Sequence, residues 1–260
     1  MAAAPAPLHL ADGELSKISE KSDVSAQYAI PEAEPFISFD ALKERIRHHY
    51  ELASDYYYSL WLTQDARGGP PETPETGGAA KLGDGSVRFV ELDAEKMGAY
   101  FTAEPNVARF DCVWISEAMS HLPNKELFFS NAALLLNPGG KLVVADWFKA
   151  EGLTEKQFAD DISPIEGTTD GMLLPPLCAQ SDYVRLAHDA GLKTFAEPLD
   201  ISKQVSKTWD ISWTLIQNPA LWAFAVAQGR DGLAFMQAFR AMRRGFANGT
   251  FRYAVMAFQK

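Results

Sequence analysis

The chain has 260 residues, more than one small core needs, so a single domain with additional segments is expected. Its composition, 47% hydrophobic and 22% charged, is that of a globular protein and excludes disorder along the whole length. A formal net charge of -10 would repel a phosphate backbone, which excludes general nucleic-acid binding and favours small molecules as partners.

The amino terminus predicts neither a signal peptide nor a membrane anchor, since it has no early basic residue and no stretch of about 18 apolar residues follows it. Only Cys112 and Cys178 are present, too few for a chain of this length that depends on disulfides. We therefore expect a soluble, cytoplasmic protein in a reducing compartment, without a transmembrane segment.

The first 86 residues divide into three predicted segments. Residues 1–35 are rich in Ala, Pro, Ser and Glu without a sustained period, which indicates a disordered leader. From Asp40 to Trp61, apolar residues recur at spacings of three and four, which predicts an amphipathic helix. Residues 62–86 hold six glycines and three prolines and are expected to form a loop within a domain that spans residues 36–260.

An α/β pattern begins at residue 87. Strands are predicted at 87–93, 110–115 and 141–147, the last two largely buried. Residues 124–136 have helical spacing and end at a Pro-Gly-Gly turn, so strand, helix and strand form a βαβ crossover in a parallel sheet.

The remaining elements continue this alternation. Ser181 is predicted to cap a helix that ends at Gly191 and leads into residues 193–196. Helices are expected around 209–216, 220–228 and 232–248, and residues 250–258 are expected to close the sheet as an edge strand. The fold class is therefore α/β.

Acidic residues lie where the predicted strands end. Ligands bind beyond the carboxyl ends of strands in an open parallel sheet, and these positions hold Asp93-Ala94, Ser116-Glu117 and Asp146. Carboxylates there favour hydroxyls, amines or a cation over a phosphate. Strand ends are also polar because they are exposed, and we favour the functional interpretation for Asp93 and Glu117 while leaving Asp146 open.

Glu117 and His121 are four residues apart and would share one face if a helix began near Ile115. A carboxylate beside an imidazole stabilises the protonated ring and orients it, which is how a general base near neutral pH is built. The alternative is that His121 is a hydrogen-bonded surface residue. Spacings typical of a metal site, an α/β-hydrolase or a P-loop are absent from the sequence.

The C-terminal third is rich in aromatic residues and methionine, which form core by default but would also suit an apolar substrate pocket. Arg240, Arg243 and Arg244 form a basic face in the same region, which is expected to be solvated rather than membrane-bound.

Three segments together resemble the middle and later motifs of class I S-adenosylmethionine-dependent methyltransferases: residues 87–94, 110–125 and 136–147. Residues 174–184 and the first helix are similar to the γ-tocopherol C-methyltransferase-like branch. The resemblance implies a Rossmann-like sheet, S-adenosyl-L-methionine as cofactor and a lipophilic small molecule as substrate, of phenolic or isoprenoid, secondary-metabolite type.

The resemblance also implies roles for individual residues. Asp93 would bind near the adenine of the cofactor, with Ala94 beside it. Ser116 and Glu117 would line the strand exit where cofactor and substrate meet, and His121 would handle the proton of the substrate, with Glu117 as its neighbour. The residue before this histidine is Glu in several relatives and Ser120 here, which removes one charge partner.

The first motif of the family is missing between Trp61 and Val87. That motif is a strand, a Gly-x-Gly loop and a second strand ending in an acid, and 25 residues without an apolar run are too few for it. We therefore expect weak or lost cofactor binding, and direct pairing of residues 87–92 with residues 110–115. The alternatives to a methyltransferase are a non-methylating pocket protein (a binding scaffold or cyclase) and a pseudo-methyltransferase that forms homo- or hetero-oligomers with a relative.

Overall fold

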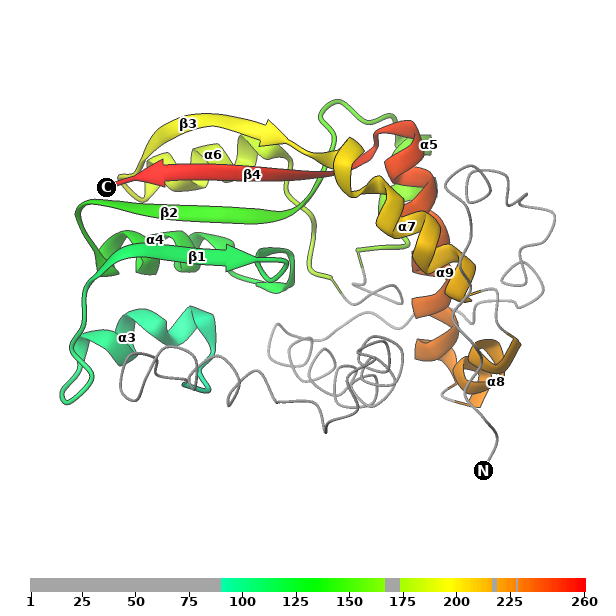
Figure 1. The fold of residues 1–260 in the computed structure, drawn as a ribbon, viewed down its shortest axis with the longest axis horizontal. Helices are drawn as coiled ribbons and strands as arrows, with labels where there is room; N and C mark the ends of the chain where they lie inside the picture. Colours follow the sequence, from blue (N-terminus) through cyan, green and yellow to red (C-terminus); the bar gives the residue numbers. More distant parts are fainter. Residues whose placement is uncertain (1–89, 167–173, 217–218, 228) are drawn as a thin grey trace, which may run out of the picture.

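The computed structural model describes residues 90–166, 174–216, 219–227 and 229–260 (Figure 1). Within them lies a four-stranded sheet of order β1-β2-β4-β3, in which β1 and β2 are parallel and β4 is antiparallel to both of its neighbours. The strands are β1 (Phe110–Ser116), β2 (Leu136–Lys149), β3 (Lys193–Asp200) and β4 (Phe251–Gln259). The predicted α/β class is confirmed, and the predicted leader, first helix and loop at 62–86 lie outside the described residues.

The βαβ unit predicted from the sequence is present. Helix α4 (Lys125–Leu135) joins β1 to β2, and the side chain of Asn124 caps it by accepting a hydrogen bond from the N–H of Leu127 at 2.9 Å. Gly140 lies near the start of β2, where the pairing with β1 is irregular and a Cβ atom would meet the carbonyl oxygen of Asn137 at 2.9 Å. The glycine thus allows α4 to lead directly into the register that places Ser116 opposite Ala145.

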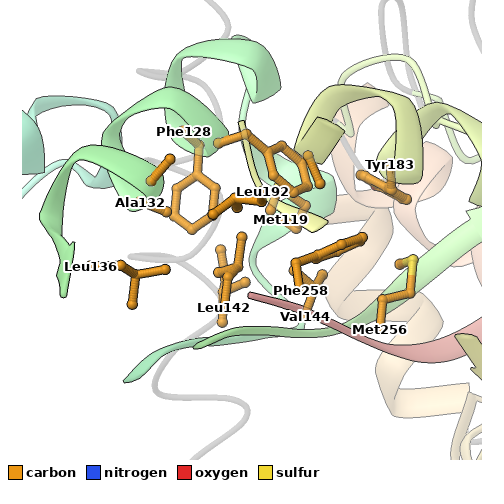
Figure 2. Packing of buried hydrophobic residues seen from close by; sticks show 14 of the residues in the cluster. Met119, Phe128, Ala132, Leu136, Leu142, Val144, Tyr183, Leu192, Met256 and Phe258 are labelled. Carbon is orange, nitrogen blue, oxygen red and sulfur yellow. The ribbon is translucent and has the colours of Figure 1, made fainter. Parts of the chain in front are cut away.

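Helices α4 and α6 (Gln180–Asp189) pack on one face of the sheet (Figure 1). Figure 2 shows the resulting core, in which buried side chains from β2, β4 and both helices interlock. Phe129 of α4 meets Phe258 of β4 edge-on, with 6.0 Å between ring centroids. The N-cap of α6 is Ala179, two residues before the predicted cap Ser181. The Asp182 carboxylate accepts from the N–H of Ala179 at 3.0 Å, while Ser181 bonds to Glu151 instead of capping.

A second group of helices lies at the end of the sheet where β1 and β2 finish (Figure 1). It comprises the short α5 (Glu155–Gln157), the π turn η6 (Phe158–Ile162), α7 (Ser202–Ile216), α8 (Pro219–Ala227) and α9 (Arg230–Asn248). Helix α9 approaches β4 closely at Gly245, where a Cβ would lie 2.7 Å from that of Phe251. The three predicted C-terminal helices are confirmed, and no helix of the described residues has the length and apolarity needed to cross a membrane.

Three predictions about the strands are wrong. Residues 90–93 form no strand and lead into the 3₁₀ turn η4 (Ala94–Lys96) and α3 (Met97–Thr102), so the described part of 87–92 does not pair with β1. β1 is mostly exposed, with 67% of Trp114 accessible, because in the described residues it pairs only with β2. β4 is an interior strand, since β3 returns along its outer side.

We expect Phe129→Ala to lower the free energy of unfolding by about 3 to 5 kcal/mol, because the fully buried ring leaves a cavity between α4 and β4. Phe195→Ala is the matched control; that ring is 53% exposed and its contact with Lys141 should cost no more than about 1 kcal/mol. Equilibrium unfolding in urea measures both. Equal losses would contradict this placement of the core.

Candidate active site

The end of β1 has an unusual backbone. Glu117 follows the last strand residue with a φ of 51°, in the left-handed region that non-glycine residues rarely adopt. Its N–H still donates to the carbonyl oxygen of Ala145 at 2.9 Å, so the left-handed residue is held in place by β2. Ser116 and Glu117 are both exposed. Strained backbone of this kind is common at functional sites, and here it turns the chain sharply at the predicted strand exit.

A tyrosine from β4 reaches this exit. The hydroxyl of Tyr253 lies 3.3 Å from Oε1 of Glu117 and 3.3 Å from the carbonyl oxygen of Ala145, and it donates to these acceptors. Burial, together with the nearby charges of Glu117 and Asp146, raises the pKa of Tyr253 to about 12. The phenol therefore stays protonated at neutral pH and holds the Glu117 carboxylate as a donor.

Asp146 holds the loop that follows the exit. Its carboxylate is fully buried and accepts from the N–H of Ser120 at 3.1 Å and from that of Trp147 at 2.6 Å. Burial raises the pKa of Asp146, and the hydrogen bonds from Trp147 and Ser120 oppose that rise. The sequence left open whether Asp146 binds a ligand or has a structural role. In the structure its carboxylate positions the loop after β1 and is not exposed to a ligand.

His121 ends the short 3₁₀ helix η5 (Met119–His121). Its ring is partly buried, 6.5 Å from that of Trp147 between centroids, and Trp147 in turn contacts Trp209 at 5.8 Å. The predicted helix that would place Glu117 and His121 on one face does not form, because the strand continues to Ser116 and Glu117 is left-handed. His121 thus lies at the start of an aromatic row.

The Asp93 segment reaches the same edge of the sheet. Asp93 caps η4, its Oδ1 accepting from the N–H of Glu95 at 2.9 Å, and Ala94 is the first residue of that turn. The Glu95 carboxylate accepts from the N–H of Asn124 at 2.7 Å, and Asn124 closes the loop that starts at Glu117. This contact brings Asp93 and Ala94 beside the loop from β1, although Asp93 does not end a strand as predicted.

A buried lysine donates a hydrogen bond to the loop that follows β1. Lys125 is 6% exposed and its ammonium donates to the carbonyl oxygen of Leu122 at 3.0 Å. Burial lowers the pKa of Lys125, while Cys178, Asp146 and other nearby groups raise it. Tyr253 could not be singled out from the sequence, because it reaches the exit only through contacts distant in sequence. Lys125 was missed because no sequence pattern marks a lysine that will be buried. Within the described residues, no three His, Cys, Asp or Glu side chains are grouped to hold a metal ion.

Part of the chain that carries this site is similar to known methyltransferases. Residues 73–144 match the family model described as "Methyltransferase domain", a range that contains β1, α4 and most of β2. A probable tocopherol O-methyltransferase of Oryza sativa subsp. japonica is 25% identical over 157 residues, covering 58% of this chain and 42% of the rice protein. Over the matched residues the chain is similar to class I S-adenosylmethionine-dependent methyltransferases, and in particular to tocopherol methyltransferases.

Other relatives match a shorter part of the chain or have a lower sequence identity. The 2-methyl-6-phytyl-1,4-hydroquinone methyltransferase of Synechocystis sp. is 38% identical over 66 residues, which is 23% of this chain and 21% of that enzyme. A solved mycolic acid cyclopropane synthase has a TM-score of 0.49 and 19% identity, covering 60% of this chain and 57% of its own. The chain spans 42% of the length of the rice protein and 44% of that of a tocopherol O-methyltransferase of Arabidopsis thaliana, to which it is 22% identical over 157 residues.

We expect Tyr253→Phe to lower the free energy of unfolding by about 1 kcal/mol at pH 8, since one hydrogen-bond donor is lost. The raised pKa of Tyr253 contributes stability that is complete below pH 10 and is lost as the pH rises toward about 12. The difference between parent and variant should therefore shrink over this window. Urea unfolding at several pH values measures it, and a difference that stays constant would contradict the buried phenol.

Proposed function

We propose that the protein is an S-adenosylmethionine-dependent methyltransferase of small-molecule metabolism that acts on a lipophilic phenolic or isoprenoid acceptor. The observation that carries the proposal is the β1 exit, where the exposed Ser116 and Glu117 lead into the loop that holds His121, the first ring of the aromatic row. The matched relatives are named for tocopherol and for a phytyl-substituted hydroquinone, and we extend that substrate class to this chain.

The side chains at the exit suit part of the cofactor. S-adenosyl-L-methionine supplies a methyl group on a sulphonium when bound, and its amine and ribose hydroxyls are hydrogen-bond donors. Glu117, Ser116 and Asp93 are acceptors, so their chemistry fits these donors and the positive sulphonium. We assign Asp93 and Ala94 to the adenosine end, and Ser116 and Glu117 to the end nearest the acceptor.

His121 is proposed as the base that removes or relays a proton from the acceptor hydroxyl. The Asp146 carboxylate holds the N–H of Ser120, so the residue before His121 is fixed and the imidazole is presented from a defined turn. Trp147 provides an apolar surface beside the imidazole on which a lipophilic ring would pack. Tyr253 keeps its proton and orients the Glu117 carboxylate by a hydrogen bond. We therefore assign Glu117 to binding of the cofactor at the exit.

The edge of β1 that faces away from β2 is a candidate surface for oligomer formation. Trp114 and Cys112 are exposed there, and β1 pairs on one side only in the described residues. Unpaired strand edges accept further strands. We propose that a second copy of the chain or a methyltransferase relative binds at this edge and forms a homo- or hetero-oligomer. We also propose a cytoplasmic location for the protein.

We expect the 260-residue chain to bind S-adenosylmethionine far more weakly than a relative that has the glycine-rich first motif, because backbone N–H groups of that motif approach the carboxylate end of such a cofactor. Glu117→Ala and Asp93→Ala should each weaken the remaining binding by about 10- to 100-fold, the value of a hydrogen bond to a charged group.

Isothermal titration calorimetry with S-adenosylmethionine measures this affinity. Asp111→Ala is the matched control, since Asp111 is an exposed carboxylate at the opposite end of β1, where it accepts from Asn137 at 2.8 Å. Tight one-to-one binding by the parent chain would refute weak binding. Unchanged binding in both Glu117→Ala and Asp93→Ala would refute their assignment.

His121→Ala should lower kcat by about 100-fold with a smaller change in KM, because proton transfer contributes along the reaction path rather than to substrate affinity. The pH dependence of kcat between pH 6 and 9 should lose one ionisation in the variant. The assay is methyl transfer to a prenylated hydroquinone at high cofactor concentration. An unchanged rate and pH profile would leave His121 as part of the pocket wall.

A further inference from the structure

A groove of about 910 Å³ lies between α7, α9 and the turn into β4, away from the β1 exit. Trp209 lines this groove and also contacts Trp147, so the aromatic row that starts at His121 ends at the groove wall. Neither the family motifs nor the proposed methyl transfer uses it. Its cationic lining side chains are Lys203, Arg240, Arg243, Arg244 and Arg252.

The charge of the groove is opposite to that of the chain. Five cationic side chains line it, whereas the whole chain has a net charge of -10. Three carboxylates balance part of this charge: Asp210 and Asp200, which line the groove, and Asp161 behind it. These carboxylates pair with Arg243, Arg252 and Arg244, and Lys203 adds a positive charge to the lining that none of the three pairs with, which favours an anionic ligand.

The ion pairs fix the orientation of the arginines. Arg243 bonds to Asp210 at 2.9 Å and Arg252 to Asp200 at 3.0 Å. Arg244 pairs with Asp161, which is 3% exposed. Although partial burial opposes it, the hydrogen bonds from Arg244 and its neighbours lower the pKa of Asp161, so this carboxylate stays charged and keeps Arg244 in place. A groove whose guanidinium groups are already positioned loses little side-chain entropy when a ligand binds.

Trp213 supplies the observation that points to a ligand. Its side chain lines the groove and is 2% exposed, and its Nε1 is buried with no hydrogen-bond partner. The Arg243 guanidinium lies 5.3 Å from the centre of its ring. A buried N–H without an acceptor is costly, so the natural partner is an oxygen atom brought by a bound molecule.

The groove also has an apolar wall. Trp209 and Phe246 both line it, and their rings stack with 5.4 Å between centroids. An aromatic or apolar body would pack against this surface while its polar end faced the cations. The wall therefore argues for an organic anion over an inorganic one.

We propose that the groove between α7 and α9 is a binding site for a small organic anion, a carboxylate or a phosphate monoester on an aromatic or apolar body. One oxygen of the anion accepts from Nε1 of Trp213 and lies beside the cationic side chains, and the body packs on Trp209 and Phe246. This site is separate from the β1 exit, so it stands or fails independently of the proposed methyl transfer.

The test is isothermal titration calorimetry of the full chain with phenyl phosphate, benzoate and inorganic phosphate as probes. Phenyl phosphate or benzoate should bind at one site, more tightly than inorganic phosphate, and which of the two binds tighter distinguishes a phosphate from a carboxylate site. Trp213→Phe keeps the ring and removes the N–H, and Lys203→Gln removes one charge; each should weaken binding by about 10-fold. The matched controls, Trp114→Phe and Lys156→Gln, should bind like the parent.

Three results would overturn the proposal. One is the absence of saturable binding of either organic probe by the parent chain. Another is unchanged affinity in Trp213→Phe, or, if that variant does not fold by circular dichroism, unchanged affinity in Lys203→Gln. The last is co-sedimentation with phosphatidylglycerol vesicles without binding of the soluble probes, which would make the basic face a membrane-docking surface.

Discussion

The buried carboxylate of Asp146 is the interaction on which the candidate active site depends. It lies in the interior of the sheet and accepts the N–H groups of Ser120 and Trp147, so it ties the loop after β1 to the end of β2. A carboxylate is expensive to bury unless its hydrogen bonds are made, which is why this loop can have only one position. This constraint fixes the turn that carries His121, while the left-handed Glu117 is held by the bond from its N–H to the carbonyl oxygen of Ala145.

The aromatic residues give the molecule its second organising feature. Trp147 leaves β2 beside His121, contacts Trp209 of α7 and meets Phe251 of β4 at 5.9 Å. This row joins the sheet to the C-terminal helices and separates an acidic exit from a basic groove. A lipophilic acceptor at the exit and an organic anion in the groove would therefore pack against the two ends of one aromatic row.

The sequence was informative where local chemistry decides the structure. The helical spacing of residues 124–136 and the Pro-Gly-Gly turn predicted α4 and its neighbouring strands, and the segment containing Ser116 and Glu117 carries part of the resemblance to methyltransferases. It misled where a pattern has two structural explanations: the spacing of Glu117 and His121 suits a helix, yet the strand continues to Ser116. Contacts distant in sequence, such as that between Tyr253 and Glu117, leave no local pattern and could not be predicted.

The most direct test of the β1 exit as the cofactor site is backbone amide chemical-shift mapping of the ¹⁵N-labelled chain on addition of S-adenosylhomocysteine. Millimolar ligand makes the measurement sensitive to weak binding. The account predicts concentration-dependent shifts at residues 116–121 and 93–95, with the amides of α7 and α9 unchanged. Shifts confined to α7 and α9, or no shifts at any concentration, would contradict it.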